Sequence, residues 1–415
     1  MLSRWRDADA HSYAEEARRD GLDPQLGLRI YTSKLIGQDP DLVLHGGGNT
    51  SVKVTGADGE PLMHIKGSGW DLDTIAAPGL PAVRLAALLA SRDGPALTDP
   101  EMVALLRQNL VDATAPNPSV EALLHAFIDH AFVDHTHSSA VLALANQADM
   151  RDRVAALYGN RVAFVPYVMP GYDLSMEGAR IYDAHPGCEG LWLENHGLFT
   201  FGPDARTSYE LMIEFVTIAE AELARAGASL APPQTTDREA PAALLDTLRR
   251  ELDRRAGGDA HVWDFRSTPA VRDYLALTNL DEVAHRGTAT PDHVIRIKPF
   301  PLILDVTADA SEVSAALDAY AERYTAYFER NAARANEPKT MLDPLPRVVL
   351  VRGQGVAGIA KGAKAARIAA DLAEQTCRIV HAAERYGTFH PLNEADLFDM
   401  EYWSLEQAKL QVKTN

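Results

Sequence analysis

Cysteine is nearly absent from this sequence, which has only two in 415 residues. Cys188 and Cys377 lie far apart and form no C-x-x-C pair. This scarcity argues against a disulfide-stabilised scaffold and a thiolate metal site, and it favours a reducing cytoplasm as the compartment.

Positive charge is also in short supply. The sequence has 40 Lys and Arg against 58 Asp and Glu, a formal net charge of -18. Because such a surface repels nucleic acid and anionic membranes, we expect neither as a partner. Any phosphate on a ligand must therefore be held by a local site, and small-molecule chemistry is favoured.

Long apolar runs are missing as well. No run reaches the roughly 18 residues of a membrane span, and the charged segment 1–18 does not resemble a signal peptide. The sequence is nevertheless 46% hydrophobic, and 415 residues are too many for one comfortable core. We expect two domains, 1–228 and 243–415, joined by the Gly- and Pro-containing segment 226–242.

An H-x-H pair stands in the apolar run 131–140. If this run is a β-strand, His135 and His137 point to the same side and converge on one point. Alone, such a pair is more often two surface or hydrogen-bonded histidines than a metal site. His196, however, ends another strand-like run and precedes Gly197, which suits a sharp turn. Three histidines would leave one zinc position open, which is typical of a catalytic site.

Five motifs follow one another along the chain: G-G-G-N-T-S at 46–51, K-G-S-G at 66–69, P-S-V-E at 118–121, H-T-H at 135–137 and N-H-G at 195–197. In this order and spacing the sequence resembles the class II aldolase/adducin family. The resemblance extends to the aldolase half of bifunctional rhamnulose-1-phosphate aldolase/short-chain dehydrogenase proteins. It implies an α/β/α layered fold with a central, mainly antiparallel sheet, and His135, His137 and His196 as ligands of Zn²⁺, with Mn²⁺ or Co²⁺ as other candidates.

The resemblance also implies a phosphate pocket, formed by Gly48, Asn49, Lys66, Ser68, Gly69 and Ser119. Glycine lets backbone amides approach an anion, and a lysine beside two glycines and a serine has the composition of an anion nest. Many relatives carry a serine where this sequence has Val120. One phosphate donor is therefore missing, and a non-phosphorylated ketone donor stays an alternative.

Glu121 is the predicted catalytic base. The segment 117–121 is typical of a helix start and would place Glu121 in the first helical turn. An acid there stabilises the dipole of any helix, so only its company with three histidines makes it a catalytic candidate. Tyr167 corresponds loosely to a family tyrosine that acts as an acid in a neighbouring subunit's site. His125 and His130 are predicted to be packing residues.

The expected reaction is aldol cleavage or formation of a ketose, with the metal stabilising an enediolate and Glu121 moving the proton. The resemblance favours a substrate like rhamnulose 1-phosphate, which gives dihydroxyacetone phosphate and an aldehyde. An epimerase or a dehydratase of the same family is an alternative, although the epimerases carry aspartate in place of Glu121. An adducin-like module without chemistry is the alternative from another class. We also expect a homo-oligomer, because relatives form tetramers.

The second half contains an echo of the first. Residues 347–360 and the helix expected after them parallel residues 189–202 and their following helix. When the two are laid over each other, Gln354 stands where His196 stands in the first half. We therefore predict a diverged second copy of the α/β unit without its metal ligands, rather than a second active site.

Overall fold

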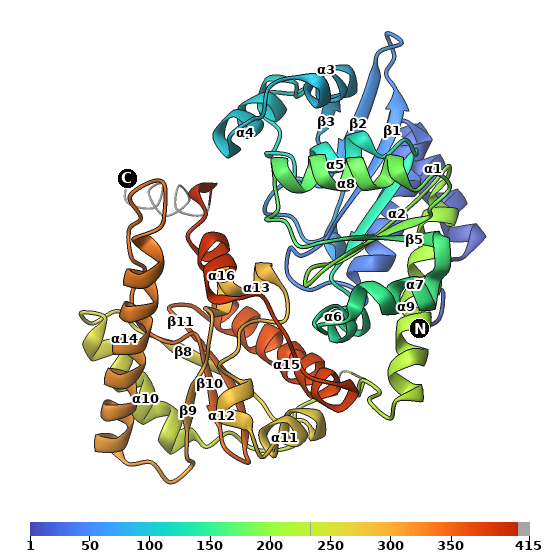
Figure 1. Cartoon of the computed structure of the whole chain (residues 1–415). Helices are drawn as coiled ribbons and strands as arrows, with labels where there is room; N and C mark the ends of the chain where they lie inside the picture. Colours follow the sequence, from blue (N-terminus) through green and yellow to red (C-terminus); the bar gives the residue numbers. More distant parts are fainter. Residues whose placement is uncertain (233, 406–415) are drawn as a thin grey trace. The chain divides into compact units, whose positions relative to one another are not determined.

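The computed structural model describes residues 1–232 and 234–405, and the chain divides into two compact units (Figure 1). Unit 1 contains residues 1–145 and 149–222, and unit 2 contains residues 146–148 and those from 223 onward. The end of the predicted second domain, 406–415, lies outside the described residues, as does residue 233 of the predicted linker.

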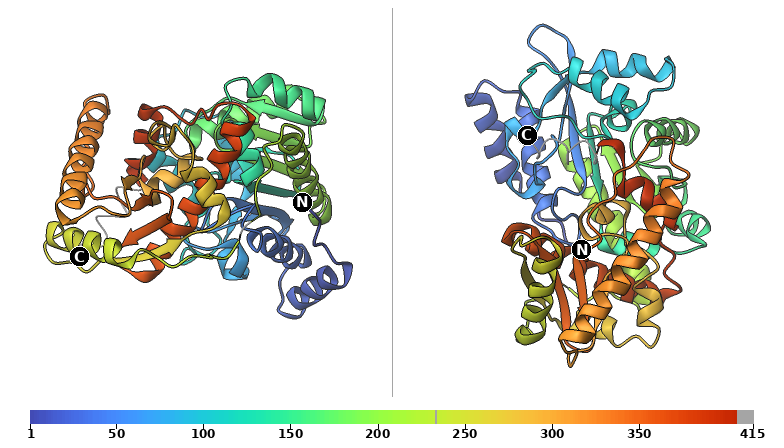
Figure 2. Two further views of the ribbon diagram at one scale, coloured as in Figure 1. Left: turned by 90° about the horizontal axis from the view of Figure 1, so that it is seen from below. Right: turned by 90° about the vertical axis from the view of Figure 1, so that its left-hand side faces the viewer.

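Unit 1 is built around a seven-stranded sheet with the strand order β3-β2-β1-β4-β7-β6-β5 (Figures 1 and 2). Its strands are β1 (Asn49–Thr55), β2 (Pro61–Ile65), β3 (Ala82–Arg84), β4 (Phe132–Thr136), β5 (Val162–Val165), β6 (Gly190–Leu193) and β7 (Gly197–Gly202). Every neighbouring pair is antiparallel except β5 and β6, which are parallel. The predicted mainly antiparallel central sheet is confirmed.

Helices lie on both faces of this sheet. They are α1 (Asp7–Arg19), α2 (Pro24–Gly37), α3 (Leu85–Ala90), α4 (Asp99–Gln108), α5 (Ala122–Phe127), α6 (Ser139–Ala145), α7 (Met150–Tyr158), α8 (Tyr172–Ala184) and α9 (Ala205–Arg225). Successive residues of β4 point to opposite faces, so Val133 packs with Leu124 of α5 and Leu174 of α8. Asp134 points the other way, towards α2 and α9.

The N-terminal segment 3–37 reads as amphipathic helix but forms two helices. Gly21 adopts a φ of 74° just after α1, a conformation that ends a helix at little cost for glycine. Asp23 then caps α2 by accepting a hydrogen bond from the Gln25 backbone, and Pro24 occupies the first helical position.

Unit 2 contains a four-stranded sheet with the order β8-β11-β10-β9. Its elements are α10 (Ala242–Arg255), β8 (Val262–Arg266), α11 (Pro269–Leu275), α12 (Leu280–Val283), α13 (Pro291–Ile297), β9 (Leu302–Leu304), α14 (Ala310–Ala332), β10 (Val348–Val351), β11 (Gly355–Ala360), α15 (Ala363–Tyr386) and α16 (Glu394–Glu401). Pairing in this sheet is antiparallel for β8 with β11 and for β11 with β10, and parallel for β10 with β9.

This pattern repeats that of β4-β7-β6-β5 in unit 1, strand for strand. The hairpins match in register too, because Leu193 pairs with Gly197 and Val351 pairs with Gly355 across turns of equal length. A long helix follows each hairpin, α9 in one case and α15 in the other. The predicted echo is therefore a repeat of topology as well as of sequence.

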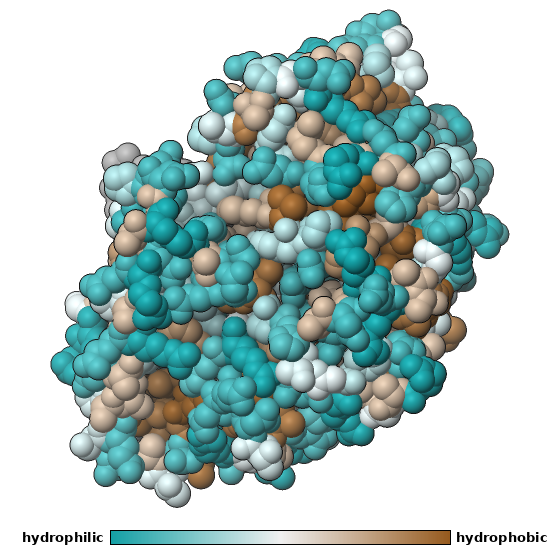
Figure 3. Space-filling view, in the orientation of Figure 1, coloured by the Kyte–Doolittle hydropathy of each residue, from teal (hydrophilic) through white to brown (hydrophobic). Residues whose placement is uncertain are grey.

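The face of the molecule seen in Figure 3 is mostly hydrophilic, with small groups of apolar side chains. No helix in the described part of the chain is long and apolar enough to cross a bilayer.

Candidate metal centre

Three histidines from two parts of unit 1 meet at one point. His135 lies near the end of β4, His137 directly follows that strand, and His196 comes from the turn between β6 and β7. Their candidate ligand nitrogens all lie within 4.8 Å of one another, and the Nε2 atoms of His135 and His137 are 3.0 Å apart. All three side chains are buried. The structure thus brings together the three histidines that the sequence singled out.

The β6–β7 turn presents His196 through an unusual backbone conformation. Asn195 adopts a φ of 54°, which asparagine tolerates better than most residues. Gly197 follows at a point of close approach. A Cβ atom there would lie 2.3 Å from the Thr136 carbonyl oxygen and 3.1 Å from Cε1 of His135. A side chain at Gly197 would therefore push the turn away from β4 and separate the histidines.

The imidazole of His135 is held in one orientation. Its Nδ1 lies 3.2 Å from the Leu198 carbonyl oxygen, which can only accept, so Nδ1 carries the proton. Phe199 stacks on the ring with the centroids 4.2 Å apart. Burial lowers the pKa of His135 to about 3 and the pKa of His137 well below its usual value. A neutral imidazole with Nδ1 protonated leaves the Nε2 lone pair of His135 free to bind a metal.

Glu121 faces the same point. One carboxylate oxygen lies 3.6 Å from Nε2 of His135, and the other lies 3.8 Å from Nε2 of His196. The residue is the N-cap of α5, which begins at Ala122, so the prediction that Glu121 lies inside the first helical turn is wrong, because the helix begins later than expected. A lone pair of His135 that faces a carboxylate is stabilised by a positive charge between the two groups. Three imidazoles are a ligand set that suits Zn²⁺ or a similar divalent ion.

Asn49 and Ser119 lie beside Glu121. Asn49 begins β1 and pairs directly with His135 of β4, which places its side chain on the same face of the sheet. Its Nδ2 lies 2.6 Å from a Glu121 carboxylate oxygen and 3.2 Å from Ser119 Oγ. Two predicted phosphate-binding residues therefore adjoin the predicted base.

The other predicted pocket residues surround this pair through backbone contacts. The ammonium of Lys66 donates to the carbonyl oxygens of Gly46 and Gly48, so it holds the glycine loop in place. The Ser68 amide donates to Asn117, and the Ser119 amide donates to Lys66. Ser68 and Gly69 are exposed. The K-G-S-G and P-S-V-E motifs are thus joined by hydrogen bonds.

Tyr167 lies just beyond β5, next to the turn that carries His196. Its backbone N–H donates to a carboxylate oxygen of Glu194, 3.0 Å away, and its side chain is half-buried. Its role as an acid stays a prediction.

His125 differs from its prediction as a simple packing residue. It lies one helical turn after Glu121 and is fully buried, and both of its ring nitrogens have polar partners. Nε2 is 2.5 Å from Asn49 Oδ1, and Nδ1 is 2.8 Å from Ser51 Oγ. The spacing of four from Glu121 was the available signal, since such residues share one face of a helix.

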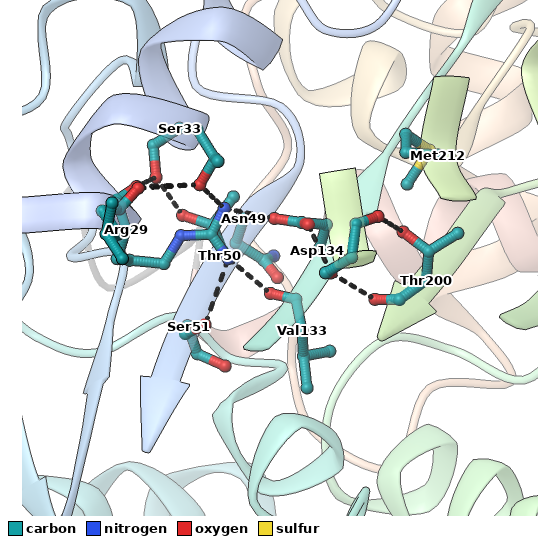
Figure 4. Close-up of polar contacts among 12 residues, drawn as sticks. Arg29, Ser33, Asn49, Thr50, Ser51, Val133, Asp134, Thr200 and Met212 are labelled. Atoms are coloured by element: carbon teal, nitrogen blue, oxygen red, sulfur yellow. Dashed lines mark hydrogen bonds and ion pairs between the residues drawn. The ribbon is translucent and has the colours of Figure 1, made fainter. Parts of the chain in front are cut away.

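The opposite face of β4 is held by a buried ion pair (Figure 4). Arg29 of α2 lies 2.5 Å from one oxygen of Asp134, and Ser208 of α9 donates to the other. Arg29 also donates to the backbone carbonyls of Ser51 in β1 and Val133 in β4. Because Asp134 lies between Val133 and His135 in the chain, this network fixes the strand that carries His135 and leads directly into His137.

The repeated hairpin in unit 2 lacks this set of histidines. With Gly355 matched to Gly197, the strand pairings place Phe265 at the position of His135. Two residues later Ser267 stands for His137, and Gln354 stands for His196. Ser267 Oγ instead donates to the Gln354 carbonyl oxygen. These three residues offer no set of metal ligands.

Two family models match consecutive parts of the chain. The first, described as "Class II Aldolase and Adducin N-terminal domain", matches residues 29–223. The second, described as "Aldolase class II, second domain", matches residues 239–410. The two models therefore account for both halves of the chain.

Individual proteins are similar to the chain as well. The Bacillus subtilis (strain 168) protein titled "Uncharacterized oxidoreductase YuxG" is 29% identical over 403 residues, which cover 92% of this chain and 57% of that protein. The chain thus spans little more than half the length of this curated relative. The N-terminal class II aldolase domain of a conserved Thermoplasma acidophilum protein is 36% identical, covering 53% of this chain and 98% of that one, with a TM-score of 0.47. L-fuculose-1-phosphate aldolase from Thermus thermophilus is 19% identical, covering 48% and 95%, with a TM-score of 0.33.

Proposed function

The chain belongs to the class II aldolase and adducin family, and from this premise we propose that it is a divalent-metal-dependent aldolase, an aldehyde-lyase acting on a ketose. One observation carries the proposal. Three buried histidines converge at a point that the Glu121 carboxylate also faces, at 3.6 and 3.8 Å from two of their nitrogens. This arrangement favours an enzyme over an adducin-like binding module without chemistry.

His135, His137 and His196 are the residues that would hold the cation, with Zn²⁺, Mn²⁺ and Co²⁺ as candidates. When bound, a divalent cation supplies Lewis acidity, which polarises a carbonyl group and stabilises negative charge on its oxygen. Burial lowers the pKa of His135 and of His137, which favours the neutral form that binds a cation, and the Leu198 carbonyl orients the ring of His135.

Glu121 is the proposed proton carrier. In the synthetic direction its carboxylate takes a proton from the carbon next to the donor carbonyl, and in cleavage it returns that proton. Asn49 donates an N–H to one of its oxygens and so keeps the carboxylate turned towards the histidines. The buried position of Glu121 keeps competing water away from the proton.

The proposed substrate is a 1-phosphoketose such as rhamnulose 1-phosphate, with Gly48, Asn49, Lys66, Ser68, Gly69 and Ser119 around the phosphate. Free ketoses are the second candidate. They are favoured by Lys66, whose ammonium already donates to two loop carbonyls, and by the amides of Ser68 and Ser119, which already donate to backbone oxygens. Because these groups already donate hydrogen bonds within the protein, fewer donors remain for the phosphate of a phosphoketose.

The test is a panel assay with the full-length protein. Protein loaded with Zn²⁺, Mn²⁺ or Co²⁺ is incubated with phosphorylated and free ketoses, and the release of dihydroxyacetone phosphate, dihydroxyacetone and aldehyde is measured. We expect cleavage of at least one ketose, its loss on chelation, and its recovery when metal is returned. Epimerised or dehydrated products without carbon–carbon cleavage would overturn the aldolase assignment, as would a protein that binds no metal.

A further inference from the structure

His125 connects two polar groups beneath the candidate metal centre. Its ring lies between Asn49 and Ser51, two residues on the same face of β1, with hydrogen-bond distances of 2.5 and 2.8 Å. Asn49 in turn reaches Glu121 at 2.6 Å. A continuous chain of hydrogen bonds therefore runs from Ser51 through His125 and Asn49 to Glu121.

The direction of each hydrogen bond follows from the chemistry at one end of the chain. An ionised Glu121 can only accept, so the Asn49 carboxamide must turn its NH₂ group towards it. Oδ1 of Asn49 then faces His125 and needs a donor, so Nε2 of His125 carries the proton. Nδ1 is left with a lone pair and accepts from the Ser51 hydroxyl. Burial supports this assignment, since it lowers the pKa of His125 and keeps the ring neutral with a single proton.

We propose that His125 is a positioning residue that fixes the Asn49 carboxamide and, through it, the orientation of the Glu121 carboxylate. The proposal rests on the proposed function, in which Glu121 moves the proton. Without the Nε2–H group, the Asn49 carboxamide could rotate by half a turn and place Oδ1 against the carboxylate. Two acceptors would then face each other, and the carboxylate would leave its position against the histidines.

Packing alone does not account for a histidine at this position. The ring contacts Phe199 edge to face, with centroids 5.3 Å apart, which an apolar side chain could also do. An apolar residue would, however, leave Asn49 Oδ1 and the Ser51 hydroxyl without this partner in a buried environment. The two ring nitrogens of His125 thus provide a donor for Asn49 Oδ1 and an acceptor for the Ser51 hydroxyl.

The kinetic test compares a variant that keeps the N–H group with one that removes it. His125→Gln places an amide N–H near the position of Nε2, whereas His125→Met has similar length and no donor. In the metal-loaded full-length protein we expect His125→Met to lower kcat about 10- to 100-fold with little change in KM or metal content. His125→Gln should recover most of that loss. Equal losses in both variants would overturn the proposal.

A double mutant tests whether His125 acts through Asn49. If it does, adding His125→Met to Asn49→Ala should lower kcat little beyond Asn49→Ala alone. Losses that multiply would mean that His125 acts by another route and would overturn the proposal. The exposed His11, changed to Met, is the matched control and should leave kcat and metal content unchanged.

A second measurement does not depend on turnover. Nitrogen-15 NMR of labelled histidine side chains in the wild-type chain, with the His125 signals assigned from their loss in His125→Gln, reports which ring nitrogen carries the proton. The neutral Nε2–H form is expected, and the Nδ1–H or doubly protonated form would overturn the proposal. An Nε2–H form in a protein that cleaves no ketose would instead overturn the proposed function.

Discussion

His135 and His137 are two of the three histidines of the candidate metal centre, and their buried environment favours the neutral form of both. Burial lowers the pKa of each imidazole, and the Leu198 carbonyl fixes the proton of His135 on Nδ1. A doubly protonated imidazolium ring could not bind a cation. An environment that favours the neutral ring therefore favours metal binding.

Variants of Glu121 and His137 should show whether metal binding and catalysis depend on different residues. We expect Glu121→Gln to keep its metal and lose at least about 100-fold in kcat, because the amide has no base to offer. His137→Ala should lose both metal and activity, because it removes a ligand. Metal content by plasma mass spectrometry and turnover on the best ketose provide the measurements. A Glu121→Gln enzyme as fast as wild type would contradict the assignment of the base.

The sequence was sufficient to predict that the histidines converge, but it did not predict the hydrogen bonds between His125 and Asn49. His135 and His137 are two residues apart at the end of a strand, so the extended backbone there explains why both point to the same side. The proposed role of His125 depends instead on Asn49, which is 76 residues away in the chain and becomes a neighbour only when the fold brings α5 against the start of β1. No local pattern carries that information.

At the scale of secondary structure, β4 is held from both sides by different interactions. Apolar packing against α5 and α8 covers the face that carries His135, whereas the Arg29–Asp134 ion pair connects the other face to α2. Both charged side chains are fully buried. Each therefore depends on the other, because an isolated buried charge is costly.

Removing one partner of this pair should destabilise the protein strongly. We expect Arg29→Met to lower the free energy of unfolding by about 3–5 kcal/mol, because Asp134 would be left charged and buried without its partner. The double variant Arg29→Met with Asp134→Leu should be less destabilised than the single one. Urea unfolding followed by circular dichroism measures both. Equal stability of Arg29→Met and wild type would contradict this account of β4.

Element boundaries were harder to predict than element types. The helix after Pro118 was expected, but Pro118 pairs with Gly67 in an isolated β-bridge, and α5 begins only at Ala122. The preceding residues are drawn into hydrogen bonds with the K-G-S-G loop. Tertiary contacts therefore moved the helix start, and Glu121 became a cap.

On the scale of the whole molecule, the chain contains one arrangement of four strands twice, but only one copy carries three histidines. Unit 2 pairs its strands as unit 1 does, yet it has Phe265, Ser267 and Gln354 at the corresponding positions. This repeat was visible in the sequence because the hairpin and its following helix are local patterns. That unit 2 is not a second active site stays a prediction, as does the homo-oligomer.

One metal ion per chain is therefore expected. Saturated protein should contain about one equivalent of metal, His196→Gln should lose it, and Gln354→His should gain none, because Phe265 and Ser267 supply no further ligand. Metal analysis together with amino-acid analysis for protein concentration gives the ratio. A ratio near two, or an increase in Gln354→His, would mean that unit 2 has ligands of its own.

The matched hairpins of the two units allow a direct comparison of two turns with the same backbone shape. Asn195 and Gly353 occupy the same place in the two turns and both have left-handed backbones, with φ of 54° and 66°, and each turn ends in a glycine. The left-handed residue and the glycine, which both turns have, are the features that the turn needs in order to close. The residue between them is His196 in one turn and Gln354 in the other, so it can change without altering the shape of the turn.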